Sequence, residues 1–158
     1  MKPSILVFAL LAGLSMGAAI PAAGAEPHDH HHEAVPAELH LDQGKKWATD
    51  APLRQGMAAM RAELANRLHA IHKDSLTKDD YAALGKSIDS QVANIVGQCK
   101  LKPEADAMLH VIIADLMAAA EAMQAKTQDS PAAGAHKAIT ALNHYGRYFD
   151  HPHWRPLK

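Results

Sequence analysis

The sequence contains a single cysteine, Cys99, so the chain cannot form an internal disulfide. Cys99 is left as a buried small side chain, a metal ligand or one half of an intermolecular disulfide. Aromatic residues are also few, with two Trp, three Tyr and two Phe, and the 16 Lys and Arg nearly balance the 17 Asp and Glu. Because a nucleic-acid-binding domain usually carries a basic excess, we expect no nucleic-acid partner.

Sequence motifs of the common enzymes and of covalent haem proteins are missing. The chain has no Gly-x-Ser-x-Gly, no phosphate-binding loop, no His-Glu-x-x-His and no Cys-x-x-Cys-His. Non-covalent haem would need a pair such as Met57 and His144. At ~100° per residue, His144 points away from the apolar stripe of its predicted helix and toward water, which disfavours haem. We therefore expect a binding protein and not an enzyme.

Residues 1–25 have the features of a cleavable signal peptide. Lys2 precedes an apolar run over residues 5–20, and Ala23-Gly24-Ala25 is a small-x-small cleavage site before Glu26. Cleavage there would remove Lys2 and no acidic residue, leaving 15 basic against 17 acidic residues. No second long apolar run follows, so we expect a periplasmic protein without stable membrane insertion, and full secretion stays open.

Apolar residues then recur at helical spacing in four segments. These patterns predict helices over residues 52–72, 77–99, 103–126 and 132–149. The first is the clearest, with its stripe at Leu53, Met57, Met60, Leu64, Leu68 and Ile71. Thr49-Asp50-Ala51-Pro52 and the capping-box-like Thr77-Lys78-Asp79-Asp80 are typical helix starts, and Pro103 fits the first position of the third helix.

Four amphipathic helices with short connections predict an all-α fold, an up-down-up-down four-helix bundle over residues 45–150 followed by a tail over 151–158. The turn around residues 96–106 would join helices two and three, with Cys99 on its inner face. Tyr145, Tyr148, Phe149 and Trp154 crowd most of the aromatic residues together. They could frame a small pocket, but we interpret them as a plug of the bundle end.

Histidine is unusually frequent, with 12 residues in 158. Residues 26–44 lack helical periodicity and predict a flexible arm that could present imidazole to Cu(II), Ni(II) or Zn(II). Its candidate ligands are His28, His30, His31, His32 and His40. Cleavage after Ala25 would make His28 the third residue, the position that an amino-terminal copper site uses. Such a site also needs the amide nitrogen of the second residue, and Pro27 has no amide hydrogen to lose, which rules it out. The alternative is a solvated polar segment that binds metal only incidentally.

A second candidate site lies at one end of the predicted bundle. Met57, Cys99 and His110 fall at similar levels when the helices are antiparallel, and thioether, thiolate and imidazole together suit Cu(I). His110 lies at the edge of its apolar stripe. The alternative is that Met57 and Cys99 are core packing and His110 a boundary residue.

Four segments of the chain are distinctive: residues 45–57, Cys99-Lys100-Leu101, residues 106–110 and residues 143–152. In these segments the chain resembles a family of small exported proteobacterial proteins, some of which carry the label DnrO. The resemblance implies a periplasmic location in a Gram-negative source, and it supplies no activity, ligand or functional residue.

The leading hypothesis is a periplasmic binding protein that handles a transition metal such as copper through the histidine-rich arm. The alternative is a metal-independent helical protein, such as a stress-response or chaperone-like accessory factor, that acts through its surface. The sequence identifies no protein partner for either.

Overall fold

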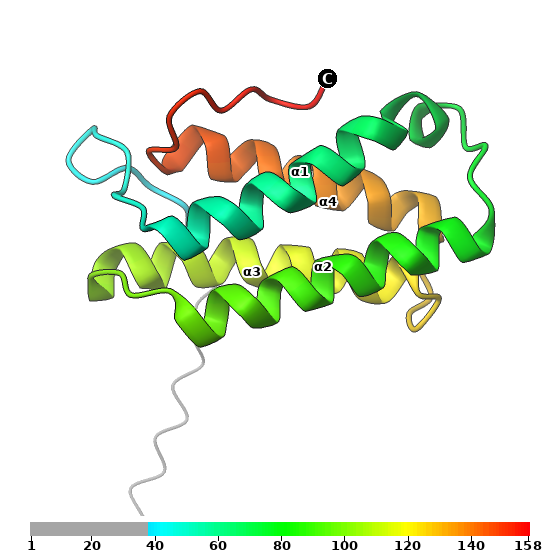
Figure 1. Ribbon diagram of the computed structural model, residues 1–158, viewed down its shortest axis with the longest axis horizontal. Coiled ribbons are helices and arrows are strands. Elements are labelled where there is room, and N and C mark those ends of the chain that lie inside the picture. The colour runs from blue at the N-terminus through cyan, green and yellow to red at the C-terminus, as the bar shows by residue number, and fades with distance from the viewer. Residues whose placement is uncertain (1–37) are drawn as a thin grey trace, which may run out of the picture. The chain divides into compact units, whose positions relative to one another are not determined.

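The computed structural model describes residues 38–158. The predicted signal peptide (residues 1–25) and residues 26–37 of the predicted arm lie outside this part. The described chain forms four helices, α1 (Ala51–His72), α2 (Lys78–Gln98), α3 (Pro103–Met123) and α4 (Pro131–Tyr148) (Figure 1). Over residues 38–158 the β-type contacts are two isolated bridges, so the predicted all-α fold is confirmed there.

Each helix begins where the sequence predicts it. Asp50 and Ser130 accept hydrogen bonds from the backbone of the first turns of α1 and α4. Thr77 and Asp80 form a full capping box at the start of α2. The start of α3 has no side-chain cap and depends on Pro103, whose missing N–H costs nothing at this position. The helix ends agree within three residues with the prediction.

Consecutive helices run in opposite directions because the connections between them are short. Each helix packs against its neighbours in sequence, and α1 also packs against α4, which closes the bundle (Figure 1). The start of α1 therefore lies at the same end as the α2–α3 turn, and the end of α1 lies at the other end with the start of α4.

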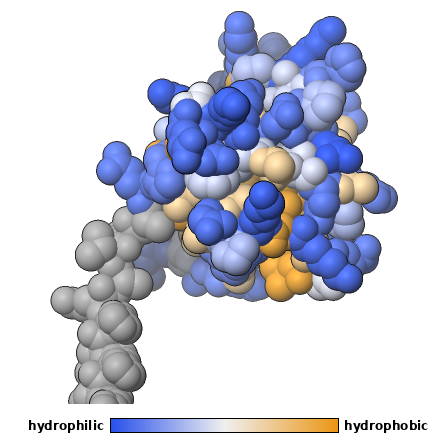
Figure 2. Space-filling view, turned by 90° about the vertical axis from the view of Figure 1, so that its left-hand side faces the viewer, coloured by the Kyte–Doolittle hydropathy of each residue, from blue (hydrophilic) through white to orange (hydrophobic). Residues whose placement is uncertain are grey.

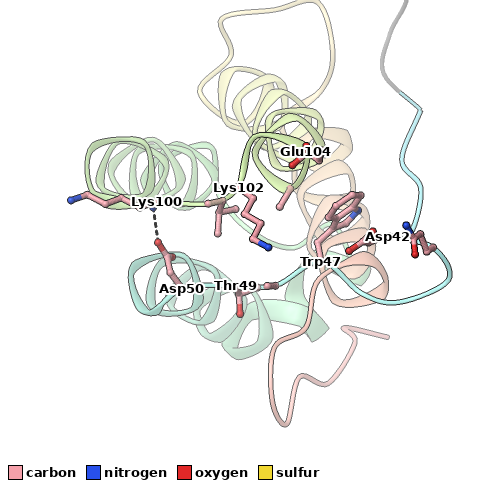
Figure 3. Close-up of a pocket in the computed structure, with 11 residues that line it drawn as sticks. Asp42, Trp47, Thr49, Asp50, Lys100, Lys102 and Glu104 are labelled. Carbon is pink, nitrogen blue, oxygen red and sulfur yellow. Dashed lines mark hydrogen bonds between the residues drawn. The ribbon is translucent and has the colours of Figure 1, made fainter.

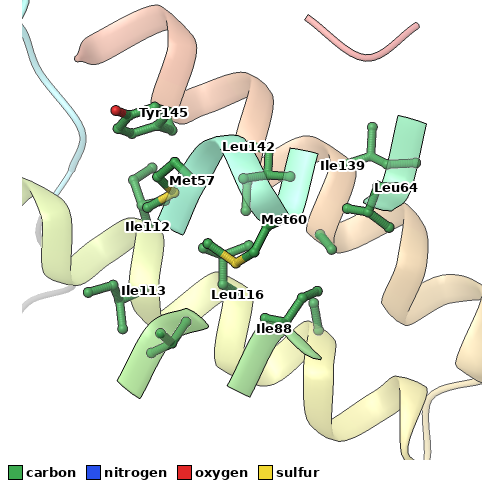
Figure 4. Packing of buried hydrophobic residues seen from close by; sticks show 14 of the residues in the cluster. Met57, Met60, Leu64, Ile88, Ile112, Ile113, Leu116, Ile139, Leu142 and Tyr145 are labelled. Carbon is green, nitrogen blue, oxygen red and sulfur yellow. The ribbon is translucent and has the colours of Figure 1, made fainter. Parts of the chain in front are cut away.

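The four apolar stripes meet in one core (Figure 4). Fully buried side chains come from every helix, and within residues 38–158 no polar or charged residue is buried. Burial of one Leu, Ile or Met contributes about 1.5–3 kcal/mol, so this core is the main stabilising element. The largest such side chains are Leu53, Met57, Met60, Leu64, Ile71, Ile95, Leu109, Ile112, Leu116, Met123, Tyr145 and Phe149.

Glycines allow helices to approach closely at two places. A Cβ at Gly134 of α4 would lie 2.7 Å from the Ala119 carbonyl oxygen of α3, and a Cβ at Gly85 of α2 would lie 2.7 Å from the Ala120 oxygen. Neither carbonyl belongs to a flexible side chain that could move away. Both glycines are therefore required by helix packing.

Beyond α4 the tail turns back along the helix (Figure 1). The side chain of Asn143 forms two hydrogen bonds with the backbone of Leu157, both 2.8 Å long. Trp154 covers Gly146, where a Cβ would lie 2.1 Å from the indole ring. The tail is thus part of the folded unit, and it covers α4 at Gly146.

Candidate functional site at the Cys99 end of the bundle

Asp50 is the centre of the polar contacts at this end. Its carboxylate accepts a hydrogen bond from the backbone N–H of Leu53 (2.9 Å). It also accepts one from the backbone N–H of Lys100 (2.6 Å), which Figure 3 shows. The Cys99 thiol lies 3.5 Å from the same carboxylate and donates to it. Asp50 therefore caps α1 and at the same time holds the α2–α3 turn.

These contacts set the acidities of both side chains. Partial burial acts to raise the pKa of Asp50, but the hydrogen bonds from Lys100, Leu53 and Cys99 outweigh it and lower the pKa overall. Burial, followed by the negative charge of Asp50, raises the pKa of Cys99 to about 12. At neutral pH the site thus contains a carboxylate and a protonated thiol, so Cys99 is a poor metal ligand until it loses its proton.

Cys99 differs from its prediction in position. It is the C-cap residue of α2 and is only partly buried, so it lies at the edge of the core. The helical stripe is regular up to Ile95, but the chain leaves helical geometry at Cys99. The thiol consequently turns toward Asp50 on the neighbouring helix.

A surface pocket of about 510 Å³ opens beside Asp50 (Figure 3). The segment before α1 forms one wall and the start of α3 forms the other. Its lining carries both signs of charge next to an indole ring, with Asp42, Trp47, Thr49, Lys100, Lys102 and Glu104 as the main residues. Such a lining could accept a small polar molecule, although no single charge dominates it.

Trp47 connects this pocket to the end of α4. Its N–H donates to the Tyr148 carbonyl and its carbonyl accepts from the Asp150 N–H, both at 2.8 Å. The indole N–H donates to the His40 carbonyl at 2.7 Å, and the His40 ring packs edge-on against the indole, 5.8 Å between centroids. His40, an expected ligand of the arm, is therefore exposed beside a buried tryptophan.

The three residues of the expected Cu(I) site differ in burial and do not line one common pocket. Met57 is fully buried in the core (Figure 4). Cys99 and His110 line a common pocket of about 210 Å³, and Met57 is not part of its wall. The His110 side chain is 66% exposed, and its Nδ1 atom lies 2.9 Å from the Asp106 carbonyl oxygen and 3.4 Å from the Asp106 carboxylate. It is thus more exposed than its expected boundary position.

The aromatic residues form a cluster at this end, as the plug interpretation expects. Tyr145 is fully buried, its ring stacks on Phe149, and its edge meets Trp154 at 4.9 Å between centroids. The Tyr145 hydroxyl lies 2.9 Å from His151 Nδ1, to which it donates when that nitrogen is unprotonated. Burial, and then the nearby Arg54, lower the pKa of His151.

His144 does not face water as the angular estimate predicts. Its side chain is half-buried beside Tyr148, and its Nδ1 atom is buried without a hydrogen-bond partner among the described residues. The estimate considers α4 alone, whereas neighbouring side chains and the tail cover part of the helix surface outside the core stripe.

Sequence reasoning predicts Asp50 as a helix cap but misses its second role. The Lys100 contact spans 50 residues, and no local pattern reports it. His28, His30, His31 and His32 lie outside the described residues. Within residues 38–158, no group of three or more His, Cys, Asp or Glu side chains is arranged to hold a metal ion.

Comparison with known proteins yields no match to a family model, to a curated protein or to a solved structure. In the described part of the chain, every helix is too short or too polar to span a bilayer.

Proposed function

We propose that this chain is an exported periplasmic protein that binds a transition metal such as copper through its histidine-rich arm. The observation that carries the proposal is the cluster His28-Asp29-His30-His31-His32-Glu33, which concentrates imidazole and carboxylate ligands in six residues. Adjacent imidazoles are suited to Cu(II), Ni(II) and Zn(II). In this proposal the bundle is the folded body to which the arm is attached.

The contact between His40 and Trp47 offers a direct test. Cu(II) bound at His40 would lie close to the indole and quench its fluorescence. In a Trp154→Phe background, where Trp47 is the remaining tryptophan, we expect Cu(II) to quench the emission and added acid to weaken the quenching, because protons compete with the metal for the imidazole nitrogens of the arm. A variant with His28, His30, His31 and His32 replaced by Ala should lose most of the Cu(II) binding measured by calorimetry.

His153→Asn is the matched control, because it removes an exposed histidine from the tail. Unchanged Cu(II) binding in the fourfold arm variant would contradict the proposal. The export part is tested separately by the intact mass of protein from the periplasm, which should begin at Glu26. Metal analysis of the same untagged material would identify the metal.

The second candidate is a metal-independent accessory protein that acts through its surface. The supporting observation is an apolar groove between α2 and α3, where Val96 and Met117 are exposed by 64% and 47%. The end view in Figure 2 likewise shows apolar side chains gathered within a mostly hydrophilic surface. Exposed apolar surface of this kind is typical of contact sites. Deletion of residues 26–37 separates the two candidates, since it should remove most of the Cu(II) binding of the arm and leave a surface-dependent function intact.

A further inference from the structure

Two histidines that the proposed function does not use lie together at the opposite end of the bundle. His72 is the last residue of α1, and His136 lies in the second turn of α4. Their imidazole rings are nearly parallel, with an interplanar angle of 2° and 5.9 Å between centroids. The pair therefore connects the end of one helix to the start of another that is distant in sequence.

The ring nitrogens of this pair are available to a ligand. Both residues are exposed. In the part of the chain that the structure describes, the histidine rings that form hydrogen bonds are those of His40, His110 and His151. The nitrogens of the exposed His72 and His136 rings therefore take part in no hydrogen bond to another described residue, and a metal ion could bind them without breaking one.

We propose that His72 and His136 bind one transition-metal ion of the type that imidazole prefers, such as Ni(II), Cu(II) or Zn(II), with water as the remaining ligands. Zinc–imidazole bonds are about 2.0–2.1 Å long, so two nitrogens on one such ion lie at most about 4 Å apart. Rings already face to face at 5.9 Å need only side-chain rotation to reach this separation, and both side chains are free to rotate in water.

The helix ends favour a cation at this position. His72 lies at the C-terminal end of α1, where the helix dipole is negative. His136 is beyond the first turn of α4, so the positive dipole end of that helix acts on it only weakly. Lys73 and Lys137 are next to the pair in sequence and are exposed, and water therefore screens their charge.

This site has a property that the arm does not share. Its two ligands come together only when α1 and α4 are folded and packed, so metal binding favours the folded state. The histidines of residues 28–32 are adjacent in sequence and need no fold to approach one another. At free metal 100 times the dissociation constant, the His72–His136 site would shift the folding equilibrium about 100-fold, with weaker linkage if the unfolded chain also binds.

Thermal unfolding of the full chain with and without Ni(II) tests the proposal. We expect Ni(II) to raise Tm by several degrees in the wild type and equally in the fourfold variant of His28, His30, His31 and His32. The rise should disappear in His72→Gln and in His136→Gln, and persist in the control His153→Asn. Because both histidines are exposed, the Gln variants should keep the metal-free Tm, which checks their folding.

Three results would overturn the inference: no rise in Tm with Ni(II), a rise that survives both single Gln variants, or a rise that is lost in the fourfold arm variant. The last would show that the stabilising metal is held by the arm. Failure of the arm proposal has a different signature, since calorimetry would then find undiminished binding in the fourfold variant. The two proposals can thus fail independently.

Discussion

Asp50 and Lys100 are joined by a hydrogen bond of 2.6 Å between the Asp50 carboxylate and the Lys100 backbone N–H. The same carboxylate caps α1 through Leu53. A single side chain consequently fixes the start of one helix against the turn that ends another. This relationship makes Asp50 the residue at which a small change should affect two elements together.

Asp50→Ala should lower the free energy of unfolding by about 2–3 kcal/mol, because it removes a helix cap and the acceptor of the Lys100 N–H. Asp50→Asn keeps one acceptor oxygen and should cost about 1–2 kcal/mol. Chemical denaturation at pH 7 measures both. Glu121→Gln, an exposed acid-to-amide change in α3, is the control and should have almost no effect.

The same residue should contribute to acid sensitivity. The pKa of Asp50 is lower in the folded protein than its usual value near 3.8, so the unfolded chain binds the proton more readily. The stabilisation is therefore complete above about pH 4 to 5 and is lost as the pH falls through the folded pKa. Between pH 5 and pH 3, Asp50→Asn should lose less stability than the wild type; an equal loss would show that Asp50 is not the responsible group.

Cys99 should react slowly with thiol reagents. Its pKa is raised from 9.0 to about 12, so at pH 8 the thiolate fraction is on the order of 1000-fold below that of an ordinary thiol. The labelling rates of the native and of the urea-unfolded protein, measured with a thiol reagent, give this ratio of reactivities. Asp50→Asn should accelerate native labelling because it removes a negative charge beside the sulfur, although burial remains. Equal labelling rates for the native and the unfolded protein would show that Cys99 is not in the partly buried position beside Asp50.

Two glycine-to-alanine changes should shift the free energy of unfolding in opposite directions. In Gly134→Ala the new methyl group would meet the backbone of α3, so we expect a loss of about 1–3 kcal/mol despite the better helix propensity of Ala. Gly97 has no neighbour within 4 Å of its Cβ position, and Gly97→Ala should stabilise the protein by about 0.5–1 kcal/mol. Urea denaturation of the two variants measures both free energies of unfolding. If Gly134→Ala is as stable as the wild type, α3 and α4 do not approach each other as closely as the structure shows.

His151 should make the tail sensitive to mild acid. Burial and then Arg54 lower its pKa below 6.5, while Asp150 opposes them, so the unfolded chain binds the proton more readily. The stabilising effect is complete above about pH 6.5 and is lost as the pH falls through the folded pKa. Protonation also prevents His151 Nδ1 from accepting the Tyr145 hydroxyl.

The fluorescence of Trp154 should report this change, because its ring lies 4.9 Å from that of His151. In a Trp47→Phe background, titration from pH 8 to pH 5 should change the Trp154 emission, and Tyr145→Phe should raise the apparent midpoint by removing the contact with neutral His151. His153→Asn serves as the control. If the midpoint changes in His153→Asn and not in Tyr145→Phe, the titrating residue is not His151 and the prediction is wrong.

The sequence predicts the helices because their signals are local. Stripes such as Leu53 to Ile71 repeat within one helix, and the Thr77 capping box lies within four residues. The contacts that build the candidate sites are not local. Asp50 meets Lys100 and His72 meets His136 only after the helices are packed.

Angular reasoning fails at the helix ends and outside the core stripes for a related reason. Cys99 follows a regular stripe but sits where the chain stops being helical, so its direction depends on the turn. His144 points away from the core stripe, yet neighbouring side chains cover part of that surface. A single-helix projection contains neither the turn nor the tail.

The pairing of Trp47 with Tyr148 and Asp150 also bears on the order of folding. The two hydrogen bonds close a loop of about 100 residues, and contacts of such long sequence separation form late because the loop entropy must be overcome first. A ribosome makes residue 47 long before residue 150, so this closure cannot form until residue 150 has been synthesised. In a chain exported as we propose, the delay would leave this contact unformed during the time when the leader has to be recognised.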